Sequence, residues 1–287
     1  MTPFEKATQN FIQHLSRDGR STHTLKNYAS DLESLSRFLR EQSLTLNQLG
    51  LPQLQAYHED LCHRGLKPNS RRRKIMTAKS FLRHLHGGKR LFSTEKLIPP
   101  DRVENPPKLI NLETLKKIIA DQDETAVGLR NRALLLTLWQ TGALVTEVLD
   151  LRKIDLKEIP KTSELEIHFL GNRERRVRVG EECARALLNL KRELPKNKNY
   201  LFYGYHRAKP HDTRVTPRAI ELQFRVWSKR YSEPQLRPRI LRHAYIMDRF
   251  RAGASEKEIM DELGLRTAYV FALYKPLLKL EADIRGN

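Results

Sequence analysis

The chain has 287 residues, with 53 Lys and Arg against 34 Asp and Glu, and a formal net charge of +19. Its hydrophobic fraction of 39% and charged fraction of 30% are typical of a globular protein rather than a disordered one. No apolar run approaches the ~20 residues that cross a bilayer, the first residues lack a secretory pattern, and two cysteines exclude a disulfide scaffold. We therefore expect a cytoplasmic protein whose positive charge attracts a polyanion.

Positive charge is spread over both halves of the chain. Residues 1–94 contain 16 Lys and Arg and 7 Asp and Glu, and the remaining residues contain 37 and 27. A basic tail on a neutral body would bind through the tail alone, whereas here both halves carry the excess. The distribution favours a clamp around duplex DNA, because each neutralised phosphate releases counterions, and it predicts association with a bacterial nucleoid. A basic surface without a polyanionic partner is the alternative.

Residues 1–92 are predicted to form a helical domain. Four segments in it carry apolar residues at helical spacing. They are residues 3–17, a segment capped by Ser21 or Thr22, residues 51–63, and residues from about 69 to 85. The connections between them are short, which predicts a four-helix unit.

Residues 93–108 contain four prolines in two Pro-Pro pairs, which oppose helix and indicate a linker to a second domain, residues 109–287. In that domain residues 164–179 alternate apolar and polar around Gly171-Asn172, a pattern that predicts two strands and a turn. Helices are expected at residues 111–121, 125–142, a short one from about 145, and at 181–193, 218–231, 241–251, 255–263 and 267–280. The predicted fold class is therefore mainly α, with a small β-hairpin or sheet, in two domains.

Basic residues gather at the start of the fourth predicted helix, where the helix N-terminus itself favours phosphate oxygens. A second, mixed polar patch near residue 24 has groups suited to phosphates or base edges, although Tyr28 fits a core position as easily. A solvated basic face is the alternative for both. The residues predicted to contact DNA in this domain are Thr24, Lys26, Asn27, Tyr28, Ser70, Arg71, Arg72, Arg73, Lys74 and Lys79.

Two further groups of arginines lie in the second domain. Arg173, Arg175 and Arg176 decorate the predicted hairpin, where either DNA contact or a solvated strand edge explains them. Arg237 and Arg239 lie at the start of a predicted helix, where the helix dipole disfavours cations. That conflict indicates an anionic partner, so all five arginines are predicted to contact DNA.

Four separate motifs resemble those of the tyrosine recombinases, especially the Xer type. They are residues 129–135 with 141–151, residues 171–175 on the predicted hairpin, residues 238–244, and Leu263-Gly264 followed by Tyr274. Residues 24–28 with Asp31-Leu32 are similar to the second helix of the family's core-binding domain. The resemblance covers nearly the whole chain and implies a two-domain recombinase architecture, with an N-terminal SAM-like core-binding domain and a C-terminal catalytic-type domain.

The family's catalytic set, as the resemblance implies, has two arginines, a lysine, two histidines (the second replaceable by tryptophan), and a tyrosine that holds DNA as a 3′-phosphotyrosine. Transferred to this sequence, the second arginine is Arg242 and the nucleophile is Tyr274. Glu147, beside the first arginine position, and His243 are also retained. The four remaining positions are occupied by Leu144, Leu170, Arg239 and Leu265.

These replacements predict a loss of cleavage, because phosphoryl transfer depends on positive charge placed around the phosphate. An unassisted tyrosine is also a poor nucleophile at neutral pH. We therefore expect a DNA-binding member of the family that acts as an accessory, regulatory or architectural factor. An active divergent recombinase, with Arg239 and hairpin arginines such as Arg173 as substitutes, is the alternative, and an RNA-binding protein is a third. Tyr274 is then either a former nucleophile or a packed aromatic residue.

No metal ion and no cofactor is expected, and duplex DNA is the predicted partner. Family members often dock their C-terminal helices into a neighbouring protomer. By resemblance we expect residues 275–287 to support DNA-dependent self-association or pairing with a catalytically intact recombinase. No outstanding amphipathic helix suggests membrane contact.

Overall fold

The chain divides into two compact units, Met1–Glu104 and Asn105–Asn287. The computed structural model describes residues 1–87, 106–171, 173–206 and 209–285. The predicted linker at residues 93–108 lies almost entirely outside the described residues. In the described part of the chain, no helix is both long and apolar enough to cross a membrane.

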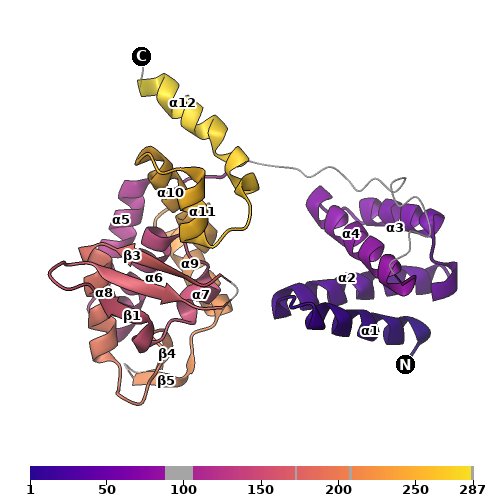
Figure 1. The fold of residues 1–287 in the computed structure, drawn as a ribbon, viewed down its shortest axis with the longest axis horizontal. Helices are drawn as coiled ribbons and strands as arrows, with labels where there is room; N and C mark the ends of the chain where they lie inside the picture. The colour runs from indigo at the N-terminus through magenta and orange to yellow at the C-terminus, as the bar shows by residue number, and fades with distance from the viewer. Residues whose placement is uncertain (88–105, 172, 207–208, 286–287) are drawn as a thin grey trace. The chain divides into compact units, whose positions relative to one another are not determined.

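The first unit contains four α-helices and one short 3₁₀ segment (Figure 1). They are α1 (Pro3–Arg17), α2 (Thr22–Glu41), η1 (Leu46–Gln48), α3 (Leu51–His63) and α4 (Pro68–Leu85). The Ser21 hydroxyl accepts a hydrogen bond from the Thr24 amide, so Ser21 caps α2. Phe11, Leu35 and Phe81 lie in one fully buried cluster. The four-helix prediction is therefore confirmed, because each helix has an apolar face and a start signal.

The second unit combines eight α-helices with two small antiparallel sheets in its described part (Figure 1). Its helices are α5 (Leu112–Ala120), α6 (Ala126–Thr141), α7 (Val145–Leu149), α8 (Glu181–Glu193), α9 (Pro217–Arg230), α10 (Pro238–Arg251), α11 (Glu256–Leu263) and α12 (Lys275–Arg285), with 3₁₀ segments η2 (Lys153–Asp155) and η3 (Ala268–Leu273). Helix α6 contacts α5, α8 and α10 and is buried nearly all round, as expected of a central helix.

The main sheet of this unit has the strand order β1-β2-β3. The strands are β1 (Leu156–Glu158), β2 (Leu165–Phe169) and β3 (Arg175–Val179), and Ile167 pairs with Val177 across the predicted hairpin. A second sheet pairs β4 (Tyr203–His206) with β5 (Lys209–Arg214). The mainly α fold with a small hairpin is confirmed, while β1, β4 and β5 were not predicted because they are short and weakly alternating.

The helix predicted at residues 267–280 is not continuous. Instead η3 ends at Leu273, the Tyr274 amide donates to the Phe271 carbonyl at 2.9 Å, and α12 begins at Lys275. Pro276 explains the break, because proline fits the first turn of a helix and clashes in its interior. Tyr274 is consequently placed in a tight turn and not on a regular helix.

Candidate functional site

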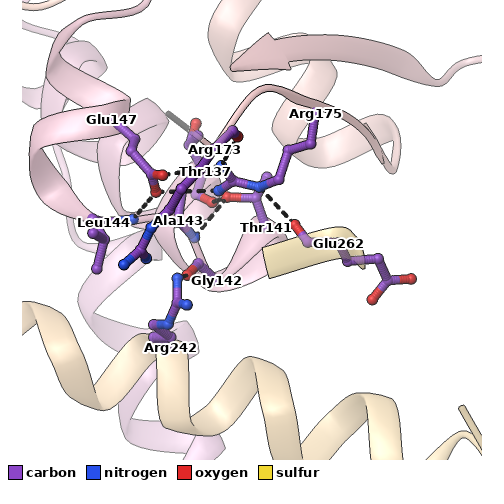
Figure 2. Close-up of polar contacts among 10 residues, drawn as sticks. All are labelled: Thr137, Thr141, Gly142, Ala143, Leu144, Glu147, Arg173, Arg175, Arg242 and Glu262. Carbon is purple, nitrogen blue, oxygen red and sulfur yellow. Dashed lines mark hydrogen bonds and ion pairs between the residues drawn. The ribbon is translucent and has the colours of Figure 1, made fainter. Parts of the chain in front are cut away.

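The turn between α6 and α7 is held against α10 and α11 by a glycine. Gly142 has a φ of 59°, and a Cβ atom there would lie 2.6 Å from Tyr245 and 2.7 Å from Leu263. Only glycine permits so close an approach in this left-handed conformation. The Gly142 carbonyl then accepts a hydrogen bond of 2.6 Å from Arg242 Nη1 on α10 (Figure 2). The turn that carries Leu144 is thereby placed beside Arg242.

Glu147 connects this turn to the hairpin. Its Oε2 accepts a hydrogen bond of 2.7 Å from the Leu144 amide, which caps α7. The same carboxylate accepts from Arg175 Nη1 and Nη2 at 3.0 and 3.1 Å (Figure 2). Arg175 also donates from Nε to the Glu262 carbonyl at 2.7 Å, and its guanidinium lies 4.5 Å from the centre of the Phe169 ring. A bidentate pair of this kind joins α7, β3 and α11 rigidly.

Arg175 points into the protein and not toward the surface of the hairpin. Arg175 was expected on the DNA-facing surface of the hairpin, but it is only 8% exposed and is enclosed by Glu147, Phe169 and α11. Strand alternation explains this, because Arg175 shares the inward face with Val177 and Val179. Arg175 therefore holds the site together from inside.

The hairpin turn also packs against the end of α11. Gly264 has a φ of 60°, and a Cβ atom there would lie 2.8 Å from the Cβ of Arg173. The Arg173 carbonyl accepts a hydrogen bond from Arg175 Nη1 at 3.0 Å. These contacts bring Arg173 to the segment that carries Leu265, which is half-buried.

Tyr274 contacts His243 on α10. The hydroxyl of Tyr274 and Nδ1 of His243 form a short hydrogen bond, and their ring centroids lie 5.7 Å apart. Tyr274 is fully buried and packs near Phe250 and Phe271. Tyr274 is thus a core aromatic residue, as one of its two predicted roles requires, and it also contacts α10.

The protonation states of this pair follow from burial. Burial, together with the charges of Arg239 and Arg242, lowers the pKa of His243 to about 4. Burial raises the pKa of Tyr274 to about 12, although Arg242 and Arg239 oppose the rise. Both groups are neutral at pH 7, so the imidazole is able to accept the phenol hydrogen at Nδ1. The contact has the geometry of a base next to a phenol, but a base with a pKa of about 4 is weak for a phenol with a pKa of about 12.

The pKa of His243 predicts how stability depends on pH. Because the unfolded chain binds the proton better than the folded chain, we expect stability to fall as the pH decreases from about 6.5 to about 4. Above pH 6.5, His243 adds nothing to the pH dependence of the free energy of unfolding. The expected loss is about 1–2 kcal/mol after allowance for solvent screening. Urea unfolding of the native protein and of His243→Gln, followed at several pH values, measures it.

The matched control for this pH experiment is His84→Gln, since burial also lowers the pKa of His84, which lies in the first unit. The chain has two tryptophans, Trp139 and Trp227, and both lie in the second unit, so tryptophan fluorescence reports on that unit alone. Equal pH slopes for native protein and His243→Gln would contradict the prediction.

Solvent exposure differs among the four positions where the resemblance implies lost catalytic residues, which are Leu144, Leu170, Arg239 and Leu265. Leu144 is 38% exposed and Leu170, directly after β2, is 47% exposed. Arg239 is exposed on the first turn of α10. The structure joins the Leu144, Arg242 and Arg173 segments through the contacts above, whereas no contact places Leu170 against them. The described residues contain no cluster of three or more His, Cys, Asp or Glu suited to a metal ion.

The other arginines predicted to contact DNA in this unit remain accessible. Arg176 is exposed on the outer face of β3 and lies 3.5 Å from Glu166. Arg237 is exposed and donates to the backbone carbonyls of Leu236 and Pro234 at 2.7 and 3.4 Å. Both side chains therefore stay exposed to solvent despite these contacts.

In the first unit, part of the basic run on α4 has an internal partner. The carboxylate of Asp31 is 2% exposed and accepts hydrogen bonds from Arg73 at 2.6 Å and from Thr77 at 3.1 Å. Lys74 Nζ lies 3.3 Å from the same carboxylate. A buried carboxylate requires such partners. Lys74 is thus largely occupied with holding α4 against α2, while the side chain of Arg73 remains 46% exposed.

The rest of the predicted contact residues are divided between surface and interior. Lys26 is exposed, Asn27, Ser70, Arg72 and Lys79 are half-buried, and Arg71 contacts the sulfur of Cys62. Thr24 bonds to the Ser21 hydroxyl at 2.8 Å, and Tyr28 packs 5.8 Å from the Phe11 ring. Tyr28 therefore has a core role, as one of its two interpretations required.

Comparisons with known proteins identify relatives over most of the chain. Residues 8–87 match the family model described as phage integrase, N-terminal SAM-like domain. Tyrosine recombinase XerC of Staphylococcus saprophyticus is 27% identical over 270 residues, covering 91% of this chain and 88% of that protein. Tyrosine recombinase XerD of Listeria innocua is 26% identical over 282 residues, covering 91% and 90%.

Solved structures show the same fold. The XerH site-specific recombinase bound to difH substrate has a TM-score of 0.67 at 17% identity, covering 91% of this chain and 79% of that chain. The Tn1549 transposon integrase in complex with transposon right end DNA has a TM-score of 0.68 at 16% identity, covering 96% and 95%.

Proposed function

Because the chain belongs to the tyrosine recombinase family, we propose that it binds duplex DNA and is strongly impaired in cleaving it unaided. The observation that carries the impairment is the exposure of Leu144 and Leu170 at the two positions where the family resemblance places cations. An exposed leucine offers no charge or donor to a phosphate. Removing one preorganised donor from such a site costs a factor of about 10² to 10³ in rate.

DNA binding is supported by charge and by the relatives. The net charge of +19 is shared by both halves of the chain, and the XerH and Tn1549 integrase structures of similar fold contain DNA. The predicted contacts that remain accessible include Lys26 and Arg73 in the first unit and Arg173, Arg176, Arg237 and Arg239 in the second. We therefore propose that both units contribute phosphate contacts.

The burial of Tyr274 also supports impairment. The tyrosine is fully buried, and the same burial keeps its phenol protonated at neutral pH. Attack on phosphorus would need both exposure of the hydroxyl and loss of its proton. The resemblance implies a histidine at the position of Arg239, and an arginine side chain is not a general acid or base near pH 7.

An active, divergent recombinase is the second candidate function. It is favoured by the contact between His243 and Tyr274, which places a neutral base on the phenol, and by the retained Arg242. A covalent link through Tyr274 distinguishes the two candidates directly.

The binding proposal predicts a steep dependence on salt. If 6–10 phosphates are neutralised, the affinity for a duplex should fall by about 10³ to 10⁵ between 50 and 200 mM salt. Fluorescence anisotropy with labelled duplex DNA measures the slope, and a duplex RNA of equal length tests the RNA alternative. Absence of binding at low salt would refute the proposal, and a preference for A-form RNA would replace it.

The cleavage proposal is tested with a nicked suicide substrate and a denaturing gel. We expect no covalent adduct from the native protein on duplexes that it binds. An adduct that disappears in Tyr274→Phe would establish the active alternative and end the proposal of impairment. Tyr28→Phe is the matched control, since Tyr28 lies in the other unit.

We further propose an accessory, regulatory or architectural role at the nucleoid, with self-association on DNA or pairing with an intact recombinase through residues 275–287. Analytical ultracentrifugation with and without DNA tests this proposal. A strict monomer on every duplex, alone and beside an active relative, would contradict it.

A further inference from the structure

Three arginines around the site lack a carboxylate partner among the described residues. The guanidinium groups of Arg173 and Arg239 make no hydrogen bond or ion pair within that part of the chain, and Arg242 donates to the Gly142 carbonyl alone. Some arginines of the same unit pair with carboxylates, as Arg175 does with Glu147 and Arg249 with Glu262, while Arg237 has only backbone carbonyls as partners. Arg239 and Arg242 differ from Arg237 in lying one turn apart on α10, beside the α6–α7 turn that accepts from Arg242.

The contacts of the hairpin place Arg173 at this site. Its Cβ lies against Gly264, and its carbonyl is held by Arg175. Figure 2 shows its side chain reaching from the hairpin toward the turn with Leu144 and toward Arg242. Burial is the main cause that lowers the pKa of Arg242 to about 10; the charge of Glu147 opposes the lowering, and the charges of Arg173 and Arg175 add to it.

Glu147 favours the charged form of Arg242 through its electrostatic field, but its hydrogen bonds go to other groups. Both of its oxygens accept hydrogen bonds from Arg175, and one also caps the Leu144 amide. Guanidinium groups near one another in a partly buried site repel each other, and a bound anion would reduce that repulsion. Guanidinium also matches phosphate geometry and forms strong charge-assisted hydrogen bonds to it.

We propose that Arg173 supplies the positive charge that position 144 lacks, and that Arg173, Arg239 and Arg242 bind one phosphate group. The source of that group is the DNA backbone, which makes this inference rest on the proposed function, and free inorganic phosphate has the same chemistry. In this phosphate-binding site, Arg173 of the hairpin takes the place of the cation that position 144 lacks. In this role Arg173 is a binding residue whose contribution is independent of any cleavage.

The first experiment measures inorganic phosphate binding by ³¹P NMR titration at constant ionic strength. Arg173→Leu should weaken binding about tenfold or more, the size of a lost charge-assisted contact, while Arg173→Lys should lose less. Arg176→Leu is the matched control, because Arg176 is an exposed arginine on the same hairpin, and it should change binding less than about twofold. Equal effects of Arg173→Leu and Arg176→Leu would overturn the proposal.

The second experiment tests whether Arg173 replaces the charge missing at position 144. In the Arg173→Leu background, Leu144→Arg should restore most of the phosphate binding, whereas in the native background it should add little. This non-additivity is a coupling that a merely structural role would not produce. Additive effects of the two substitutions would contradict the proposal. Urea unfolding of each variant shows that it is folded.

Binding of duplex DNA, measured with the same variants, distinguishes a failure of the phosphate site from a failure of DNA binding. If the native protein binds phosphate with the expected Arg173 dependence but binds no duplex, the site stands and the DNA proposal fails. If it binds duplex DNA with a steep salt dependence but Arg173→Leu leaves phosphate binding unchanged, the DNA proposal stands and the phosphate site is refuted.

Discussion

Replacing Glu147 with glutamine is expected to lower the free energy of unfolding of the second unit by about 3–5 kcal/mol. The reason is that Arg175, whose side chain is 5% exposed, would keep its charge in the interior without a carboxylate. The substitution also weakens the acceptor for the Leu144 amide. Urea unfolding followed by tryptophan fluorescence measures the change, since both tryptophans lie in this unit.

The control for Glu147 is Glu166→Gln, which removes the carboxylate near Arg176. Because Arg176 is 61% exposed, its free energy contribution should be at most about 1 kcal/mol. The double variant Glu147→Gln with Arg175→Met removes both charges and should recover much of the lost stability. A loss for Glu147→Gln no larger than that for Glu166→Gln would show that the buried pair is not structural.

The second large effect concerns catalysis. A variant with Leu170→Lys and Arg239→His is expected to form a covalent adduct with nicked duplex DNA, at a rate about 10²-fold or more above the native protein. A lysine at the exposed position 170 would supply a proton for the leaving oxygen, and a histidine at 239 titrates near neutral pH. Position 144 is left as leucine because Arg173 is proposed to provide its charge.

Adduct formation by this variant must depend on Tyr274. Adding Tyr274→Phe should abolish the adduct, while the native protein and the Arg239→His single variant should give little or none. If the double variant remains inactive although it binds duplex DNA as well as the native protein, the replacements at positions 170 and 239 are not sufficient to explain the impairment, and Leu144, Leu265 and the burial of Tyr274 remain as causes.

Local patterns were sufficient for most helices and for the main hairpin. Apolar periodicity and start signals such as Ser21 predicted α1 to α4, and Gly171 with alternating neighbours predicted β2 and β3. The inward position of Arg175 was also contained in the alternation with Val177 and Val179, and Pro276 marked the break before α12. Strand parity at Arg175 and the proline at position 276 are therefore stronger local signals than side-chain charge and helical periodicity.

Other features depend on residues far apart in the chain. The pairing of Asp31 with Arg73 joins residues of α2 and α4, and no local pattern specifies it. The closeness of Arg173 to Arg242 similarly depends on Gly264 admitting the hairpin turn beside α11. Strand β1 and the β4-β5 pair formed where tertiary packing outweighed weak local preference.

The amino-acid sequence by itself determined the helical character of both units, the basic charge and the family resemblance, because periodicity, composition and motif order are local or additive properties. Only the tertiary structure decided which charges are available. It buried Arg175 against Glu147, left Arg173 near Arg242 with no carboxylate partner among the described residues, and enclosed Tyr274 next to His243. The physical reason is that the pKa, partners and exposure of a side chain are set by whichever distant segments pack around it.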